Sequence, residues 1–514
     1  MLRASNPFRV VAALLAAGLL PAFAADQPQW GERWTRNQVS SETGLPETFD
    51  PATGRNVAWT ARLGSETYST PVVAAGRVFI GTNNDPPRDP RLKGDRGVHL
   101  CLDEKDGRLV WQLALTKRGP TAYWDWPRSG SCSPVTVEGD RVYTVTCRGE
   151  VVCLDLDGLA DGNDGPFKDE GALFAPKGDP PLEPAATDAD VIWITDLTRE
   201  AGVRQHDGAH SSILVHGPHL YVNTSNGLND AHTAIENPEA PSLVVIEKAT
   251  GRIVAREAEG IGRKTFHSTW SSPALGEVKG RPLVFFGGGD GVVYAFEPFD
   301  RAGNAPGAEV PAGTASVPAP LKCAWRFDCD PEAPKEDVQK YIRNRKVSPS
   351  NIKSMPVFHD GRLYVTSGGD VWWGKPQAWL KCVDAAAGTG DITKAGLLWS
   401  YALRSHCMST PAVHGGLVYA ADCGGGVHGV DAATGQAVWT HEAGGDMWAS
   451  PLVADGKVYI GTRRGTLWVL AAGREKRVLG EVALKSPIHA TAVAANGALY
   501  VATMTHLYAV RQVD

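Results

Sequence analysis

The 514-residue sequence lacks three features that would place it in other classes of protein. Its Lys and Arg residues are not clustered and its formal net charge is −6, so no nucleic acid or anionic membrane surface is expected as the main partner. No apolar run after residue 24 is long enough for a membrane-spanning helix. The Cys-x-x-Cys-His sequence that attaches a haem is also absent, so no haem is expected.

Long stretches with helical periodicity are nearly absent too, which disfavours helical bundles and α/β folds. The sequence is instead rich in turn-forming residues, with 57 glycines and 35 prolines. Apolar residues make up 43% of the chain, which suffices for a large core. These observations predict an all-β protein.

The strongest pattern is a repeat between Cys407 and Leu470, in which Pro411 and Pro451 hold matching positions 40 residues apart. Each copy has a Ser/Thr-x-Pro opening, an alternating apolar run, a glycine turn, a Val-Tyr run, a second turn and a third apolar run. The first copy adds a Thr-Gly turn and a fourth run that contains a tryptophan. Four short strands joined by hairpins, with a period of about forty residues, are typical of one propeller blade.

Counting these openings predicts an eight-bladed β-propeller of four-stranded antiparallel blades. Proline suits an opening because the first strand of a blade lines the central channel, where one edge has no ladder partner. The segment from Val57 to Leu63 has the pattern of a fourth strand without a blade of its own, so we expect it to complete the last blade and close the ring. The openings are Pro71, Pro134, Ser212, Pro273, Pro356, Pro411, Pro451 and Ala492.

The chain is predicted to have three parts: a signal peptide at residues 1–24, an N-terminal extension at 25–55 and the propeller at 56–514. Arg3 and Arg9 precede a short apolar run that ends in the small-x-small cleavage pattern Ala22-Phe23-Ala24. No twin arginine and no cysteine stand at the cleavage point, which disfavours folded export and a lipid anchor. We therefore expect a periplasmic or secreted protein.

Long insertions fall in blades 1 to 4, and such loops commonly carry the specificity of a propeller. Blade 2 is expected to be followed by an Asp/Gly-rich segment and a proline-rich run to Asp190, and residues 301–320 are expected to be unstructured. Residues 330–347 are predicted to form the one clear helix, since acidic residues come early in this segment and basic residues late.

A motif recurs where the third strand of a blade ends: a small residue, an Asp two positions later, a Gly and then a Trp. It occurs from Cys101 to Trp111 and from Gly429 to Trp439. We expect the Trp to pack between neighbouring blades. Cys101, Cys153 and Cys382 hold the small position of the motif and are expected to be packing residues.

These motif segments resemble those of the pyrroloquinoline-quinone-type (PQQ-type) repeat propellers, whose motif is Ala-x-Asp-x-x-Thr-Gly-Lys-x-x-Trp. The resemblance covers nearly the whole mature chain and implies eight blades. Its members include periplasmic quinoprotein alcohol dehydrogenases, which bind PQQ with calcium, and a non-catalytic lipoprotein of the outer-membrane assembly machinery. The sequence departs from both, because it has no adjacent cysteine pair and has Ala25-Asp26, not a cysteine, after the leader.

Two cysteine pairs flank hairpins and are predicted to form disulfides. Cys132 and Cys147 would be directly opposed across a two-residue turn at Gly139-Asp140, and Cys407 and Cys423 flank the equivalent hairpin in blade 6. Oxidation fits an exported protein. The pairing of Cys101, Cys153, Cys323, Cys329 and Cys382 stays open.

Residues just before the openings should surround one mouth of the channel, so this mouth is the candidate ligand site. The alternative is that a wet channel mouth is lined by polar and aromatic groups that only cap the blades. No nucleophile with a base can be identified, so no catalytic residue is assigned. The candidate ligand-binding residues are Glu66, Tyr68, Arg128, Asp207, His210, His267, Trp270, Asn351, Lys353, His406, Asp446, Trp448 and His489.

Two segments suggest metal ions. In the sequence His-Asp-Gly-Ala-His, His206 and His210 stand four residues apart at a strand start, where they need not converge, so metal ligation there is disfavoured. The loop from Leu154 to Phe167 is dense in Asp, Asn and Gly and is a candidate calcium loop, although it misses the EF-hand pattern. Its candidate ligands are Asp157, Asp161, Asn163 and Asp164.

The function expected from the sequence is binding or scaffolding through the central mouth and the long loops of blades 1 to 4. Its partner would be an unknown protein, small molecule or carbohydrate, and no cofactor is expected. The alternatives are a quinoprotein oxidoreductase that uses PQQ and calcium, and a carbohydrate-binding propeller. The aromatic residues from Tyr123 to Arg128 would serve as a stacking platform or, in the favoured interpretation, as a plug on the mouth.

Overall fold

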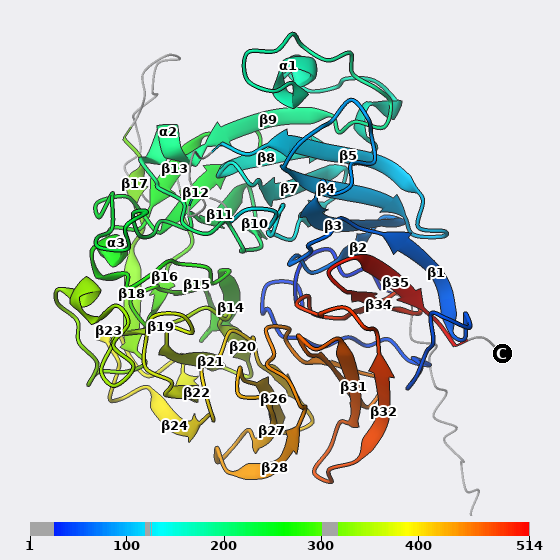
Figure 1. Ribbon diagram of the computed structural model, residues 1–514. Helices are drawn as coiled ribbons and strands as arrows, with labels where there is room; N and C mark the ends of the chain where they lie inside the picture. The colour runs from blue at the N-terminus through cyan, green and yellow to red at the C-terminus, as the bar shows by residue number, and fades with distance from the viewer. Residues whose placement is uncertain (1–24, 119–123, 125, 301–316, 513–514) are drawn as a thin grey trace, which may run out of the picture.

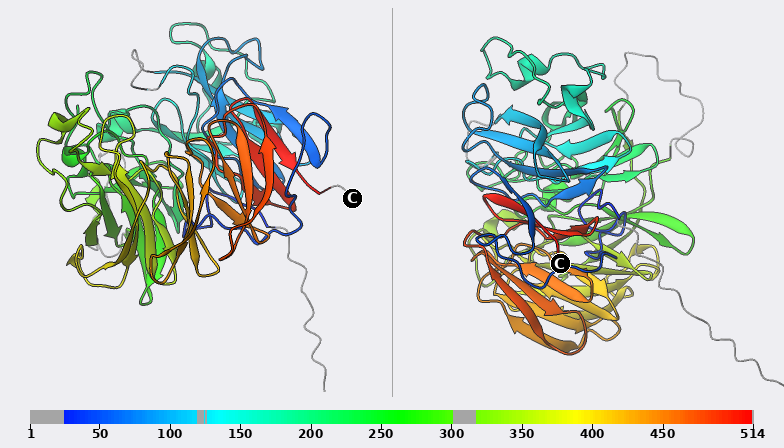
Figure 2. Two further views of the ribbon diagram at one scale, coloured as in Figure 1. Left: turned by 60° about the horizontal axis from the view of Figure 1, so that its bottom comes forward. Right: turned by 90° about the vertical axis from the view of Figure 1, so that its right-hand side faces the viewer.

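A computed structural model describes residues 25–512, apart from 119–123, 125 and 301–316. The expected signal peptide, Tyr123 and most of the blade 4 insertion thus lie outside the described residues. Eight β-sheets stand around a central axis, as predicted (Figure 1). Figure 2 shows the same ring tilted and from the side.

Each sheet is one blade, and in blades 1 to 7 the main strands run in chain order from the axis outwards. Blade 1 contains β2 (Val72–Ala74), β3 (Arg77–Asn83), β4 (Arg96–Asp103) and β5 (Leu109–Thr116). Blade 2 contains β6 (Thr136–Glu138), β7 (Arg141–Val145), β8 (Glu150–Asp155) and β9 (Val191–Asp196). Blade 3 contains β10 (Leu214–His216), β11 (His219–Asn223), β12 (Leu243–Glu247) and β13 (Ile253–Arg256), with β17 (Ala319–Pro320) added in parallel.

The remaining blades follow the same plan. Blade 4 contains β14 (Ala274–Val278), β15 (Arg281–Gly287), β16 (Val292–Phe296) and β18 (Cys323–Asp328), with the short β23 (Gly390–Asp391) at its edge. Blade 5 contains β20 (Val357–His359), β21 (Arg362–Gly369), β22 (Ala378–Asp384) and β24 (Leu397–Ala402), and β19 (Ser350–Asn351) pairs with β21. Blade 6 contains β25 (Ala412–His414), β26 (Leu417–Ala421), β27 (Gly426–Asp431) and β28 (Ala437–Glu442). Blade 7 contains β29 (Leu452–Ala454), β30 (Lys457–Gly461), β31 (Thr466–Ala471) and β32 (Val478–Ala483).

The two ends of the chain meet in blade 8, as the sequence predicted. This blade contains β33 (Val493–Ala495), β34 (Ala498–Ala502), β35 (His506–Val510) and, as its outer strand, β1 (Val57–Arg62). β1 pairs antiparallel with β35, so the ring closes between segments far apart in sequence. No blade edge is therefore left open at the seam.

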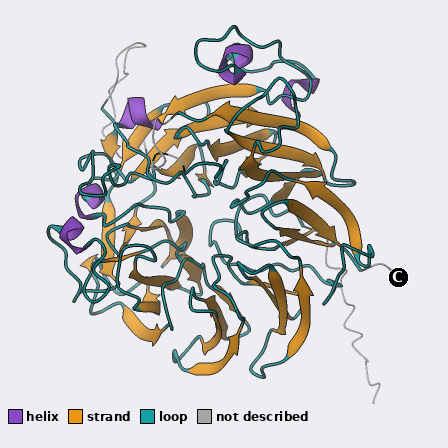
Figure 3. Cartoon of the chain, viewed as in Figure 1, coloured by secondary structure: helices purple, strands orange, loops and turns teal. Residues whose placement is uncertain are grey.

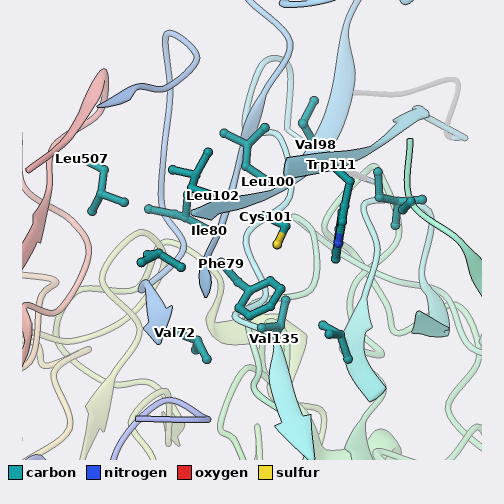
Figure 4. Close-up of a cluster of buried hydrophobic side chains, with 14 of the residues drawn as sticks. Val72, Phe79, Ile80, Val98, Leu100, Cys101, Leu102, Trp111, Val135 and Leu507 are labelled. Atoms are coloured by element: carbon teal, nitrogen blue, oxygen red, sulfur yellow. The ribbon is translucent and has the colours of Figure 1, made fainter. Parts of the chain in front are cut away.

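Six tryptophans of the outer strands join neighbouring blades. In the strand that closes the ring, Trp59 Nε1 donates to the carbonyl of Glu104 in blade 1 at 2.9 Å, and Trp111 Nε1 donates to Leu156 in blade 2 at 2.8 Å. The same bond is made by Trp193, Trp325, Trp399 and Trp439. The expected packing role of this residue is confirmed, and Figure 4 shows Trp111 in the core that blade 1 shares with Val135 of blade 2 and Leu507 of blade 8.

The small residue of the motif lies under the tryptophan of its own blade. Cys101, Cys153 and Cys382 pair across the strands with Trp111, Trp193 and Trp399, and Gly429 pairs with Trp439. A Cβ added at Gly429 would lie 2.5 Å from the indole of Trp439, so a large side chain is excluded there. These three cysteines are packing residues, as expected.

The predicted disulfides are wrong: none of the nine cysteines, all of which lie in described residues, is bonded to another. The expected register is present, since Thr136 opposes Tyr143, but both strands end before they reach the cysteines. Cys132 Sγ turns to the carbonyl of Ser129 at 3.6 Å, whereas Cys147 Sγ turns to Leu115 of blade 1 at 3.8 Å.

In the blade 6 hairpin the second predicted pair is separated in the same way. Cys407 Sγ donates to Ala421 at 3.1 Å, and Cys423 Sγ donates to Met447 of the following opening at 3.7 Å. Each thiol donates a hydrogen bond to a nearby carbonyl and is not bonded to the opposed thiol.

The predicted helix at residues 330–347 is also wrong. Only η2, one 3-10 turn at Val338–Tyr341, forms there, since Asp337 and Arg343 on either side have φ of 47° and 69°. Such left-handed residues break a helix.

The blade 2 insertion lies within the blade, between β8 and β9, not after it. Short helical elements lie at the periphery of the ring (Figure 3): η1 (Gly158–Ala160), α1 (Glu170–Phe174), α2 (Leu197–Ala201) and α3 (Ile261–Lys264).

The N-terminal extension runs inside the ring and contacts the innermost strand of all eight blades (Figure 1). Its backbone forms hydrogen bonds with the unpaired edges of these strands: Val137 N donates to Pro28 O at 2.8 Å and Val453 N donates to Gln38 O at 2.9 Å. The amide of Asn37 pairs with both backbone groups of Val413. The remaining blades are reached by Gln27, Trp34, Thr35 and Ser40.

Arg36 fixes this extension at the axis. Its guanidinium is fully buried and donates to Pro273 O at 2.9 Å, to Trp30 O at 3.0 Å and to both oxygens of Ser212. Burial lowers the pKa of Arg36 to about 9, because no carboxylate lies beside it to offset the loss of water. The extension thus closes the channel below the mouth.

Candidate functional site

A pocket of about 460 Å³ occupies the mouth of the channel, and eight of the thirteen predicted binding residues line it. Trp30 of the N-terminal extension also lines the pocket, so the extension contributes to the pocket wall. The predicted residues in its wall are Tyr68, Asp207, His210, His267, Trp270, Lys353, Trp448 and His489.

The other five predicted residues lie outside the wall. Three support it from behind: Glu66 accepts from Tyr68 Oη at 3.0 Å, Asn351 donates to Asp370 at 3.0 Å, and Asp446 pairs with Arg463 at 2.7 Å. Arg128 is exposed, and its backbone N–H donates to Asp95. His406 is half-buried and its Nδ1 faces Ser405.

Asp370, which sequence reasoning missed, organises one side of the pocket. It is fully buried at the end of β21, where its Oδ2 lies 2.9 Å from Lys353 Nζ, and it accepts from Nδ1 of His267 at 3.0 Å. Its other oxygen accepts the backbone N–H groups of Trp372 and Trp373 at 2.9 and 3.0 Å. Burial alone would raise the pKa of Asp370, but Lys353 and His267 hold it well below its usual value. The carboxylate is therefore ionised.

Six tryptophans among the described residues line the pocket. Trp270 and Trp372 meet edge to face with centroids 5.5 Å apart, and Trp372 meets Trp448 at 5.7 Å. Lys353 Nζ lies 4.0 Å above the ring of Trp270, and Arg463 lies 4.4 Å above Trp448. Trp372 is 37% exposed, so part of its ring is open to a ligand.

Two histidines of the wall are held neutral. His489 accepts from Arg463 Nε at 3.0 Å, and burial together with Arg463 lowers its pKa to about 3. Burial also lowers the pKa of His210, which packs against Trp270. Both therefore present uncharged rings to the pocket.

A second group of histidines gathers where blades 3 and 4 begin. Three loops form a short ladder there, because Gly227 N donates to Arg204 O at 3.1 Å and Leu228 N donates to His267 O at 3.0 Å. A Cβ at Gly227 would lie 2.7 Å from Cβ of His206, so only glycine allows the loops to come this close. The ladder brings His206 beside His267, whereas His210 packs against Trp270.

The tentative calcium loop is rearranged. Asp161 and Asp164 lie near Asp155, with ligand oxygens within 4.8 Å of one another. The other two predicted ligands turn away: Asp157 pairs with Arg77 at 3.0 Å, and Asn163 donates to Glu170 at 2.8 Å. Calcium binding here stays a prediction on two of its four residues.

The alignment of blade openings did not identify Asp370, Trp372, Trp373 or His232. All four belong to insertions between the second and third strands of blades 3 and 5, and not to the openings that were aligned. The one available signal was the pair of tryptophans that begins two residues after Asp370 at a strand end.

The PQQ and calcium pair fits this pocket poorly. Calcium takes six to eight oxygen ligands. Among the described lining residues Asp207 supplies the one carboxylate, and its near neighbours are imidazole nitrogens. The indole walls could cover a planar ring, but the donor set for the ion is missing.

The fold and the pocket define a closed eight-bladed propeller with a tryptophan-lined pocket at its axis. The sequence model of the family described as outer membrane protein assembly factor BamB matches residues 36–159, 94–297 and 323–512. The chain belongs to this PQQ-type repeat family. Among curated proteins, none matches the sequence significantly.

Solved structures share the architecture at low sequence identity. BamB from Moraxella catarrhalis is 12% identical with a TM-score of 0.52, over 88% of this chain and 96% of that chain. The computationally designed Ika8 protein is 10% identical with a TM-score of 0.50, over 88% and 99%. A europium-containing methanol dehydrogenase is 11% identical with a TM-score of 0.46, over 93% and 89%. At such identities the likeness shows the fold alone.

Proposed function

We propose that this protein is a binding module that takes a small ring-shaped ligand, foremost a carbohydrate, into the mouth of its propeller. The observation that supports this is the pocket of about 460 Å³, which has tryptophans among the residues that line it. Concave sites with apolar walls and a few polar groups are the usual form of a small-molecule site.

The charges in the pocket favour an uncharged ligand. Lys353 is paired with Asp370 and Arg463 with Asp446, so both cations have their charge offset before a ligand enters. The rest of the wall includes indole and imidazole rings, and its one carboxylate among the described lining residues, Asp207, lies against two of the histidines. Sugar rings present apolar faces for stacking and hydroxyls for hydrogen bonds, which matches this surface.

Tryptophan fluorescence titrated with neutral oligosaccharides tests the proposal. We expect saturable quenching that Trp372→Ala weakens at least tenfold, because this ring forms an accessible wall. The matched control is Trp379→Ala, which removes a half-buried indole that does not line the pocket. Equal affinity of both variants, or no saturable response to any oligosaccharide, contradicts the proposal.

The weaker alternative is a quinoprotein oxidoreductase. It rests on the PQQ-type repeat of the family. The described lining residues include only one carboxylate, which disfavours calcium and therefore this alternative. An absorption spectrum of protein reconstituted with PQQ and calcium distinguishes the two: a bound quinone band with dye-linked oxidation supports the enzyme, and no band supports a binding module.

We further propose export, in keeping with the family. The support is the leader pattern of residues 1–24. Within the described residues no helix has the length and apolarity to cross a membrane. The long loops of blades 1 to 4 would then face periplasmic partners. Cell fractionation tests this: recovery in the cytoplasm with residues 1–24 intact would contradict export.

A further inference from the structure

Three histidines from three different loops meet at one side of the pocket. His206 precedes blade 3, His232 lies in the insertion between β11 and β12, and His267 precedes blade 4. One ring nitrogen of each lies within 4.8 Å of the corresponding nitrogens of the other two. His206 and His267 are buried, and His232 is half-buried. The backbone ladder through Gly227 holds the first and third loops together.

Each ring is oriented by an oxygen at its Nδ1. This atom lies 2.8 Å from Leu228 O in His206, 3.2 Å from Asp230 O in His232 and 3.0 Å from the Asp370 carboxylate in His267. An N–H at Nδ1 leaves the lone pair of the neutral ring at Nε2. Histidines that bind metals are held in this way by a carbonyl or carboxylate behind the ring.

A carboxylate lies beside two of the three histidines. Oδ2 of Asp207 lies 3.6 Å from Nε2 of His206 and 3.4 Å from Nε2 of His267. Ligands about 2.0 to 2.1 Å from a tetrahedral zinc ion are roughly 3.3 Å apart, close to these spacings. Asp207 has φ of 56°, and its second oxygen is buried without a hydrogen bond. The structure thus holds this carboxylate against the histidines at a conformational cost.

We propose that His206, His232, His267 and Asp207 bind a divalent transition-metal ion, with zinc as the reference ion. Three imidazoles and one carboxylate suit zinc, copper, iron or nickel, whereas calcium and magnesium take oxygen ligands. The Asp370 carboxylate then has two roles: it orients a ligand histidine and it pairs with Lys353 in the adjoining wall.

The ion would lie between two cavities. His232 lines the central pocket and also a groove of about 700 Å³ that is bounded by Asp337, Arg343 and Trp373. Metal can therefore exchange through the groove, and a ligand in the pocket can come close to the ion.

Cobalt titration of the mature chain without an affinity tag tests the site. We expect one equivalent of Co²⁺ to give the intense visible absorption of a four-coordinate nitrogen and oxygen site, and one equivalent of Zn²⁺ to remove it, while a hundredfold excess of Ca²⁺ does not. No saturable visible band, or removal of the band by calcium, overturns the proposal.

Variants locate the ion. His232→Ala changes a half-buried loop residue and is expected to weaken Co²⁺ binding at least a hundredfold, and Asp207→Ala is expected to weaken it tenfold or more. The matched control is His406→Ala, a half-buried histidine outside the cluster, which should bind Co²⁺ like the parent. Thermal unfolding of the metal-free variants confirms that each is folded. Undiminished binding by folded His232→Ala overturns the proposal. The oligosaccharide titration tests the ligand pocket independently, so either proposal can fail without the other.

Discussion

The Lys353 ammonium lies 2.9 Å from the Asp370 carboxylate, with both groups buried at the wall of the pocket. This pair joins blade 5 to the residues before its opening and places the tryptophans that follow Asp370. Stability and site geometry therefore depend on the same carboxylate.

Asp370→Asn should destabilise the protein by about 3 to 5 kcal/mol, because it leaves a buried lysine without its partner charge. Chemical denaturation monitored by tryptophan fluorescence measures this. The control is Asp446→Asn, which breaks the partly exposed pair with Arg463 and should cost about 1 kcal/mol or less. Similar losses in both variants would show that the Lys353 pair contributes no more than a surface one.

Arg36→Lys should loosen the N-terminal extension, since an ammonium cannot form all the hydrogen bonds that the guanidinium donates to Pro273, Trp30 and Ser212. We expect a loss of about 2 to 4 kcal/mol, from several hydrogen bonds of a charged donor. Limited proteolysis should then cut within residues 25–50 before the propeller is cleaved. Arg33→Lys, at an exposed position, is the control and should leave the cleavage rate unchanged.

Gly435→Ala tests the packing between blades 5 and 6. Its φ of 73° strains any side chain, and an added Cβ would lie 2.7 Å from the ring of Trp399. Gly416 in the same blade has a matched φ of 74° with no atom within 4 Å. We expect Gly416→Ala to cost about 1 to 2 kcal/mol from backbone strain alone and Gly435→Ala roughly 1 to 3 kcal/mol more. Equal midpoints of thermal unfolding would refute the steric role of Trp399.

Asp290→Asn should stabilise the protein at neutral pH. Burial raises the pKa of Asp290 from 3.8 to about 6, although Tyr294 Oη donates to it at 2.8 Å. The folded state therefore favours the protonated acid, and stability falls as pH rises from about 4 to 6 while the unfolded chain ionises. Asparagine removes this loss, on the order of 3 kcal/mol above pH 6.

Thermal unfolding from pH 4 to 8 measures the effect of Asp290→Asn. The gain over the parent should be largest above pH 6 and vanish near pH 4. Glu277→Gln, an exposed carboxyl of the same blade, serves as the control. A gain that is the same at every pH would show that ionisation of Asp290 is not its cause.

The local repeat explains how much of the fold the sequence predicted. The openings, the tryptophans and the ring closure at Val57 follow from patterns that span one blade, and the structure confirms them. The predicted disulfides and the helix at 330–347 were wrong, because strand ends and left-handed residues depend on neighbouring blades, which a local pattern does not contain.

The site was predictable only in part, for the same reason. Aligning the openings correctly gathered Tyr68, His267 and Lys353 at one mouth, since equal positions in equal blades face the axis. Asp370 and His232 come from insertions whose paths no repeat determines, and the N-terminal extension was known only as a segment before the first blade.

The sequence by itself determined the blade, its number and its closure, because period, turns and apolar alternation act over short distances. Only the tertiary structure decided which insertions meet above the axis, that the extension closes the channel below it, and that three histidines face one point. Those contacts join residues far apart in the chain, and they form only when the ring brings the blades together.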